Sequence, residues 1–79
     1  MVIDSSVLIA ILSNEQDAAR FAQAIADASV RLMSAASWLE TAIVIEARYG
    51  LPGGEKLDQL LQTAQIHVEP VTVEQASVA

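Results

Sequence analysis

The chain has 79 residues, 53% of them hydrophobic and none of them cysteine, so it forms one small domain at most and has neither disulfides nor thiolate metal sites. Ten acidic residues against four basic ones give a net charge of −6, which argues against nucleic-acid binding through a basic patch. No apolar run reaches the roughly 18 residues that cross a bilayer, and no charged signal-peptide start is present, so we expect a cytoplasmic protein without a membrane partner.

The first half of the chain predicts two strands with helices between them. Residues 1–3 are apolar and predict a short buried strand. Ser5-Ser6 is expected to cap a helix whose apolar positions lie within residues 7–12. A capping-box pattern at residues 13–16 predicts the start of a second helix, and residues 30–33 predict the second strand.

The longest predicted helix has two possible starts. It opens at Ser34 or at Ser37 and runs to Tyr49. Its residues are apolar on most of the circumference, so we expect it to be largely buried. Gly50 and Pro52 are expected to end it, as a glycine followed by a proline often does.

The last third of the chain predicts one more helix and one more strand. Gly53-Gly54 is expected to be a loop, and the leucine stripe within residues 57–64 predicts an amphipathic helix. Residues 66–69 alternate like a strand that Pro70 closes. A capping box at residues 72–75 predicts a further helix start.

This order of elements predicts an α/β fold. Strands separated by helices join through crossovers, so the sheet is expected to be parallel, with helices on both of its faces. Three strands cannot cover four or five helices well, and a helix of one turn is unstable alone. We therefore expect the domain to continue beyond residue 79.

Asp4 is the first candidate site residue, because an acid between two apolar runs needs a helix N-terminus, a basic partner or a metal ion to compensate its charge. Ligands of parallel sheets bind beyond the carboxyl ends of the strands, where Asp4 is expected to lie. The alternative is an N-cap of the following helix, which explains the residue equally well.

Glu40 is the second candidate, because it lies on a helix with little polar surface. If the helix begins at Ser37, Glu40 completes a capping box. If it begins at Ser34, which a strand ending at Met33 favours, Glu40 lies more than one turn inside and near the same sheet edge as Asp4. Two acids converging there would repel each other unless a divalent cation lay between them.

The predicted ion is Mg²⁺ or Mn²⁺, because the ligands are hard oxygens and no histidine is near them in the sequence. Asp4 and Glu40 are the predicted metal ligands. Ser5 and Ser6 are candidates for contacting a water or a phosphate, but helix capping explains them nearly as well and comes first for Ser6. A two-metal nuclease would need three or four carboxylates.

Two segments resemble PIN-domain proteins, and specifically the VapC-type ribonuclease toxins of toxin–antitoxin pairs. IDSSVL at residues 3–8 is similar to the family's first-strand motif, whose acid is a metal ligand. SAASWLE at residues 34–40 is similar to its second motif, whose glutamate completes the site. The resemblance implies a Mg²⁺-dependent endoribonuclease with Asp4 and Glu40 as catalytic residues, a homodimer, an RNA substrate and a VapB-type antitoxin partner.

The resemblance also implies that something is missing. The family supplies further essential acids from a later segment, so residues 1–79 are expected to be the N-terminal portion of a single PIN-like domain. The predicted architecture is a three-layer α/β/α domain, incomplete because its C-terminal strands are missing, and inactive by itself. The alternative is a catalytically inactive PIN fragment that acts only as an interaction module.

Overall fold

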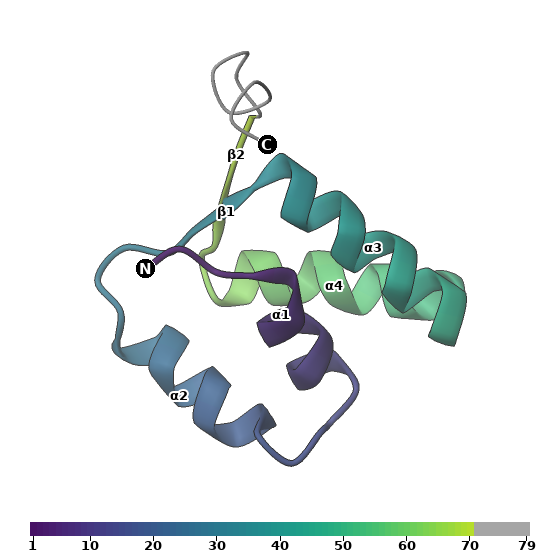
Figure 1. The fold of residues 1–79 in the computed structure, drawn as a ribbon, viewed down its shortest axis with the longest axis horizontal. Helices are drawn as coiled ribbons and strands as arrows, with labels where there is room; N and C mark the ends of the chain where they lie inside the picture. Colours follow the sequence, from purple (N-terminus) through teal and green to yellow (C-terminus); the bar gives the residue numbers. More distant parts are fainter. Residues whose placement is uncertain (71–79) are drawn as a thin grey trace.

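The computed structural model describes residues 1–70, which form four helices and a small sheet at one end of them (Figure 1). The elements in chain order are α1 (Ser5–Leu12), α2 (Ala18–Asp27), β1 (Leu32–Ser34), α3 (Ala35–Tyr49), α4 (Leu51–Thr63) and β2 (His67–Glu69). The helix start predicted at residues 72–75 lies outside the described residues.

The sheet is parallel, as the sequence predicts. β1 pairs with β2 in a register that places Leu32 opposite His67 and Ser34 opposite Glu69. The first predicted strand is reduced to a single parallel bridge between Val2 and Leu32, where the Ile3 amide donates to the Leu32 carbonyl at 2.7 Å. Together with the helices, this confirms the α/β class.

One hydrophobic core joins all these elements. α1 packs against α2, α3 and α4, and α3 also packs against α4 and both strands. The buried core residues are Ile3, Leu8, Ile25, Met33, Leu57 and Ile66, and α3 adds the partly buried Trp38 and Ala42 that pack against them. The N-terminal segment and both strands therefore hold their ends in fixed positions relative to α1 and α3.

The connection between α1 and α2 differs from the prediction. Ser13 caps the C-terminus of α1 instead of opening a helix, and Asn14 follows it with a φ of 52°. This left-handed conformation interrupts the helical backbone, and asparagine adopts it more readily than most residues. α2 then begins at Ala18, so the helix start predicted at residues 13–16 was wrong.

The start of α3 resolves the two alternatives left by the sequence. Ser34 is the N-cap, and its Oγ accepts a hydrogen bond from the Ser37 amide at 3.0 Å. At the other end Gly50 takes a φ of 69° and α4 begins at the next residue. The loop predicted at Gly53-Gly54 was therefore wrong, because both glycines lie in the first turns of α4.

The predicted burial of α3 was also wrong. Only Thr41 and Ile45 are buried on this helix, whereas Leu39 and Ile43 are 53% and 60% exposed. α1 and α4 cover one side of α3, and the side that carries Leu39 and Ile43 has no such cover within residues 1–70. In the same part of the chain, no helix is both long and apolar enough to cross a membrane.

Candidate metal centre

Asp4 lies two residues after the Val2 bridge and is the N-cap of α1. Its Oδ1 accepts from the Ser5 amide and its Oδ2 from the Ser6 hydroxyl, both at 2.9 Å. The N-cap alternative is thus confirmed for Asp4, and the predicted capping by Ser5-Ser6 was wrong. Each carboxylate oxygen keeps a free lone pair, because an ionised carboxylate accepts about four hydrogen bonds. Asp4 is exposed, so these lone pairs face solvent.

Glu40 lies in the second turn of α3. Because the helix begins after Ser34, Glu40 is too far inside to complete a capping box, and that alternative was wrong. Helical rise places its Cα about 9 Å along the axis from Ser34. Cα–Cβ bonds tilt toward the N-terminus of a helix, which for α3 means toward the sheet. Glu40 is exposed, and among residues 1–70 no hydrogen bond or ion pair engages its carboxylate.

The sheet register relates the two acids. Val2 is level with Leu32, so Asp4, two residues later, lies at the level of Ser34. Ser34 ends β1 and opens α3, the helix that carries Glu40. Because the strands are parallel, Asp4 and the N-terminus of α3 lie at the same edge of the sheet, beyond the carboxyl ends of its strands. This is where ligands bind in folds of this type.

The donor set fits a hard divalent cation. Mg²⁺ is commonly held by one or two carboxylates, with water and substrate phosphate completing the shell. Asp4 is already oriented by two hydrogen bonds, a feature typical of metal-ligating carboxylates. Within the described residues no group of three or more acids or histidines gathers to form a complete cage. Asp4 and Glu40 therefore suit a water-rich site for one ion.

Ser5, Ser6 and Glu69 lie next to the candidate site. Ser5, a candidate for a water or phosphate contact, is only 6% exposed, whereas Ser6 is exposed and donates to Asp4. Ser6 is therefore the hydroxyl residue that orients the acid. Glu69, which we did not single out from the sequence, ends β2 opposite Ser34 at the same edge. Because Glu69 is the last residue of a predicted strand, its place at this edge could have been predicted from the sequence.

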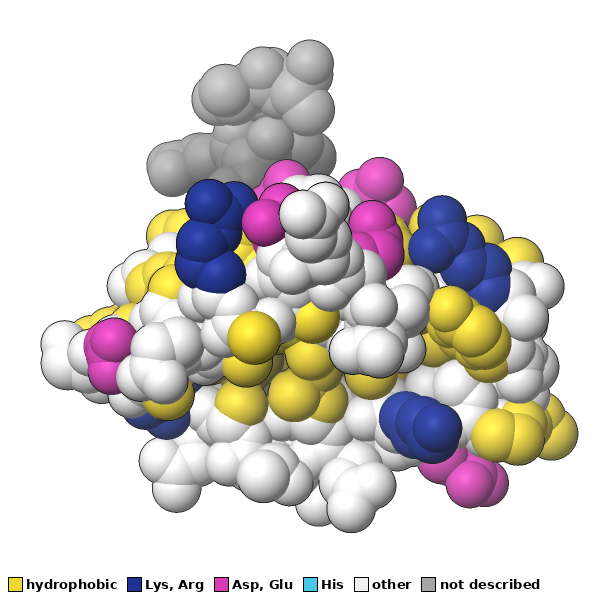
Figure 2. Space-filling view, turned by 90° about the horizontal axis from the view of Figure 1, so that it is seen from below, with side chains coloured by type: hydrophobic (Ala, Val, Ile, Leu, Met, Phe, Trp, Pro, Cys, Tyr) yellow, Lys and Arg dark blue, Asp and Glu magenta, His cyan; other side chains and the backbone are white. Residues whose placement is uncertain are grey.

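Other polar residues lie apart from this edge or make local contacts. His67 is exposed, and its Nε2 lies 3.4 Å from Glu69 Oε1. Basic side chains stand apart from one another on the face shown in Figure 2. Arg20 pairs with Asp17 at 3.3 Å and Arg48 donates to the Ser13 hydroxyl at 3.2 Å.

Comparison with known proteins assigns the chain to a family. Residues 1–79 match the PIN domain over their whole length. The chain belongs to the PIN-domain family. This PIN domain is 53% identical over 79 residues to ribonuclease VapC30 of Mycobacterium tuberculosis, a match that covers all of this chain and 60% of that protein.

Further relatives carry similar names. A ribonuclease VapC of Mycolicibacterium smegmatis is 53% identical over the same 79 residues, which make up 61% of its length. Ribonuclease VapC28 of Mycobacterium tuberculosis is 47% identical, with 59% of its length covered. The PIN domain described here thus spans about three fifths of the curated relatives that it matches.

Proposed function

We propose that this PIN domain belongs to a Mg²⁺-dependent endoribonuclease, the toxin of a VapBC-type toxin–antitoxin pair. The observation that carries the proposal is the position of the two acids at one edge of the sheet: Asp4 comes after the parallel Val2–Leu32 bridge, and Glu40 lies on α3, the helix that follows β1. The names of the relatives, all VapC ribonucleases, support the substrate class. Mn²⁺ is the other ion that this oxygen donor set suits.

The chain's own residues contribute charge and orientation to the reaction. The Ser5 amide and the Ser6 hydroxyl donate hydrogen bonds to the Asp4 carboxylate, so its oxygens are already oriented before a ligand binds. Glu40 supplies a second negative oxygen from α3. When bound, a divalent cation supplies Lewis-acid activation of a water molecule and of the scissile phosphate. The net charge of −6 on these residues repels an RNA backbone, and a cation bound between Asp4 and Glu40 would reduce that repulsion at the site.

We also propose that the 79 residues bind the ion without cleaving RNA. Two carboxylates satisfy one Mg²⁺, but phosphodiester hydrolysis by two metals needs more acidic ligands than residues 1–70 bring together. The remaining ligands are expected in the part of the relatives that this chain does not match.

A chimaera tests the ribonuclease proposal. The 79 matched residues of ribonuclease VapC30 are replaced by this chain, and cleavage of a mixed RNA substrate is followed with Mg²⁺ and with a chelator. We expect Mg²⁺-dependent cleavage that falls at least about a hundredfold in Asp4→Asn and in Glu40→Gln, since even residues that only support metal ligands contribute 10–100-fold. Asparagine caps helices as well as aspartate does, so Asp4→Asn preserves α1.

Glu46→Gln is the matched control. Glu46 is exposed on the same helix, six residues after Glu40 and so on another side of α3, and its loss of charge is expected to leave cleavage unchanged. A folded chimaera that cleaves RNA at its usual rate without Asp4 contradicts the proposal. Cleavage by the 79-residue chain alone would contradict only the proposed inactivity.

An interaction module is the second candidate function, because Leu39 and Ile43 leave apolar surface exposed on α3. In the toxin proposal this surface joins two copies into a homodimer, and a VapB-type antitoxin presents a basic side chain to Asp4 and Glu40. In the alternative, the fragment is inactive and binds a partner only. Size-exclusion chromatography of Leu39→Lys and of Ile43→Lys tests the role of α3. If this surface stays in solvent, both variants elute at the same volume as the unchanged chain.

A further inference from the structure

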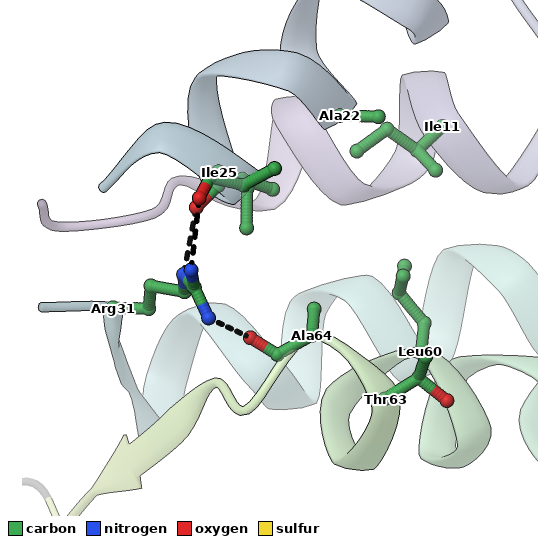
Figure 3. A pocket seen from close by; sticks show the side chains of 8 residues that line it. Ile11, Ala22, Ile25, Arg31, Leu60, Thr63 and Ala64 are labelled. Atoms are coloured by element: carbon green, nitrogen blue, oxygen red, sulfur yellow. Dashed lines mark hydrogen bonds between the residues drawn. The ribbon is translucent and has the colours of Figure 1, made fainter. Parts of the chain in front are cut away.

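A pocket of about 290 Å³ separates α2 from α4. Ala22 and Ile25 line it from α2, Ile11 from α1, and Leu60 and Thr63 from α4. Figure 3 shows α1 and α2 on one side of this space and α4 on the other. α2 therefore forms one wall of the pocket and does not fill the gap to α4.

Of the helices in residues 1–70, α2 is the least tightly packed against the core. Ile25 is its only buried residue, and α1 is the helix against which it chiefly packs. Its N-cap, Asp17, makes no capping hydrogen bond with its side chain. The segment that leads into it contains Asn14 with its positive φ. Few buried contacts and irregular connections are typical of segments that open locally.

Arg31 crosses the end of this pocket and joins the two walls (Figure 3). Its Nε and Nη2 donate to the carbonyls of Ile25 and Ala26 in the last turn of α2, at 2.7 and 3.0 Å. Its Nη1 donates to the carbonyl of Ala64, the C-cap of α4, at 2.9 Å. The backbone of Arg31 is fixed in the sheet, because its own carbonyl accepts from the His67 amide at 2.9 Å.

We propose that Arg31 is the latch of a conformational device in which α2 opens and closes one wall of this pocket as a unit. The C-terminal carbonyls of α2 and α4 carry partial negative charge, and the guanidinium is the cation that satisfies both helix ends. Within residues 1–70 no carboxylate lies within ion-pair distance of Arg31, so its charge is directed to these carbonyls alone. Releasing them frees the end of α2 from α4.

The planar fork of arginine is essential to the latch. Each of the three guanidinium nitrogens donates one hydrogen bond, in a direction fixed by the plane of the group. A lysine ammonium is also charged but cannot donate in those three directions. Arg31→Met keeps much of the apolar stem and removes every donor. Arg31→Lys keeps the charge and loses the geometry. Arg31→Lys is therefore expected to weaken the connection between the ends of α2 and α4, and Arg31→Met to remove it.

Thiol labelling measures the opening directly, because the chain has no cysteine of its own. Ile25→Cys introduces a thiol on α2 where the side chain is 3% exposed, and Leu57→Cys introduces one on α4 where it is 1% exposed. Labelling at position 25 reports release of α2, and labelling at position 57 reports unfolding of the core. We expect Arg31→Met to raise the labelling rate at position 25 about tenfold or more, and to leave the rate at position 57 unchanged.

Arg48→Met is the matched control, since Arg48 lies on α3 and donates to the Ser13 hydroxyl, and neither residue lines the pocket. It is expected to change neither rate. The latch is overturned if Arg31→Met leaves labelling at position 25 unchanged, or if it raises both rates together. If Arg31→Met fails to fold, the same two labelling rates are measured in Arg31→Lys. Faster labelling at position 25 alone supports the latch. An unchanged rate at position 25, or faster labelling at both positions, overturns it.

Discussion

Gly53 and Gly54 are neighbours in α4 that meet different surroundings, so alanine at each position is predicted to have opposite effects on stability. A Cβ at Gly53 would lie 2.8 Å from Tyr49 Cβ, 2.9 Å from Ile45 Cγ2 and 3.0 Å from the Ile45 carbonyl oxygen. These atoms belong to the backbone of α3 or lie next to it, so they cannot move away separately. A Cβ at Gly54 would chiefly meet the end of the Glu46 side chain, with Oε1 at 2.9 Å.

The magnitudes follow from two opposing contributions. Alanine in place of glycine stabilises a helix interior by about 0.8–1.0 kcal/mol. Overpacking costs about 1–3 kcal/mol, and the three close contacts at Gly53 place it in the upper part of that range. Gly53→Ala is therefore expected to lower the free energy of unfolding by about 1–2 kcal/mol. At Gly54 the exposed Glu46 carboxylate swings aside, and the variant is expected to gain about 0.5–1 kcal/mol.

Urea unfolding followed by far-UV circular dichroism measures both variants against the unchanged chain. The expected separation between them is about 2 kcal/mol, several times the usual effect of a surface substitution. Equal unfolding midpoints for the two variants, or a Gly53→Ala protein more stable than the unchanged chain, would refute the close packing of α3 against α4. If the two glycines formed a loop, both substitutions would have similar small effects.

Two further substitutions test the ends of α3 by the same unfolding assay. Gly50 has a φ of 69° and a ψ of −157°, a combination open almost only to glycine, so Gly50→Ala is expected to cost about 1–3 kcal/mol. A cost near zero would show that the turn between α3 and α4 adopts another conformation. Ser34→Ala removes the Oγ that accepts from the Ser37 amide, with an expected loss of about 1 kcal/mol. Ser34→Asp, which still caps the helix, should recover most of it, and equal losses in both variants would rule out the capping role.

The parallel sheet, and the edge at which the candidate site lies, can be predicted from the sequence because they follow from the order of strands and helices along the chain. A strand followed by a helix and another strand requires a crossover, and a residue directly after a strand lies at its carboxyl end. Asp4 and Glu40 were selected on that basis, and the structure places Asp4 beside the N-terminus of the helix that carries Glu40. Whether they hold a metal is a separate claim that their position supports.

Features that depend on tertiary neighbours were not readable. Gly53-Gly54 has the composition of a loop, but the absence of a side chain at Gly53 lets α4 approach Ile45, and this packing outweighs the weak helix propensity of glycine. Apolar periodicity shows that α3 is hydrophobic without showing that Leu39 and Ile43 stay uncovered within residues 1–70. Arg31 is similar: its partner Ala64 lies 33 residues away, and no local pattern connects the two.

Mn²⁺ binding to the chain, followed by electron paramagnetic resonance, measures whether Asp4 and Glu40 together bind one divalent cation. We expect one ion per chain, with binding at least about tenfold weaker in Asp4→Asn and in Glu40→Gln and unchanged in Glu46→Gln. Unchanged Mn²⁺ affinity in both of the first two variants, with their helical content intact, would contradict it.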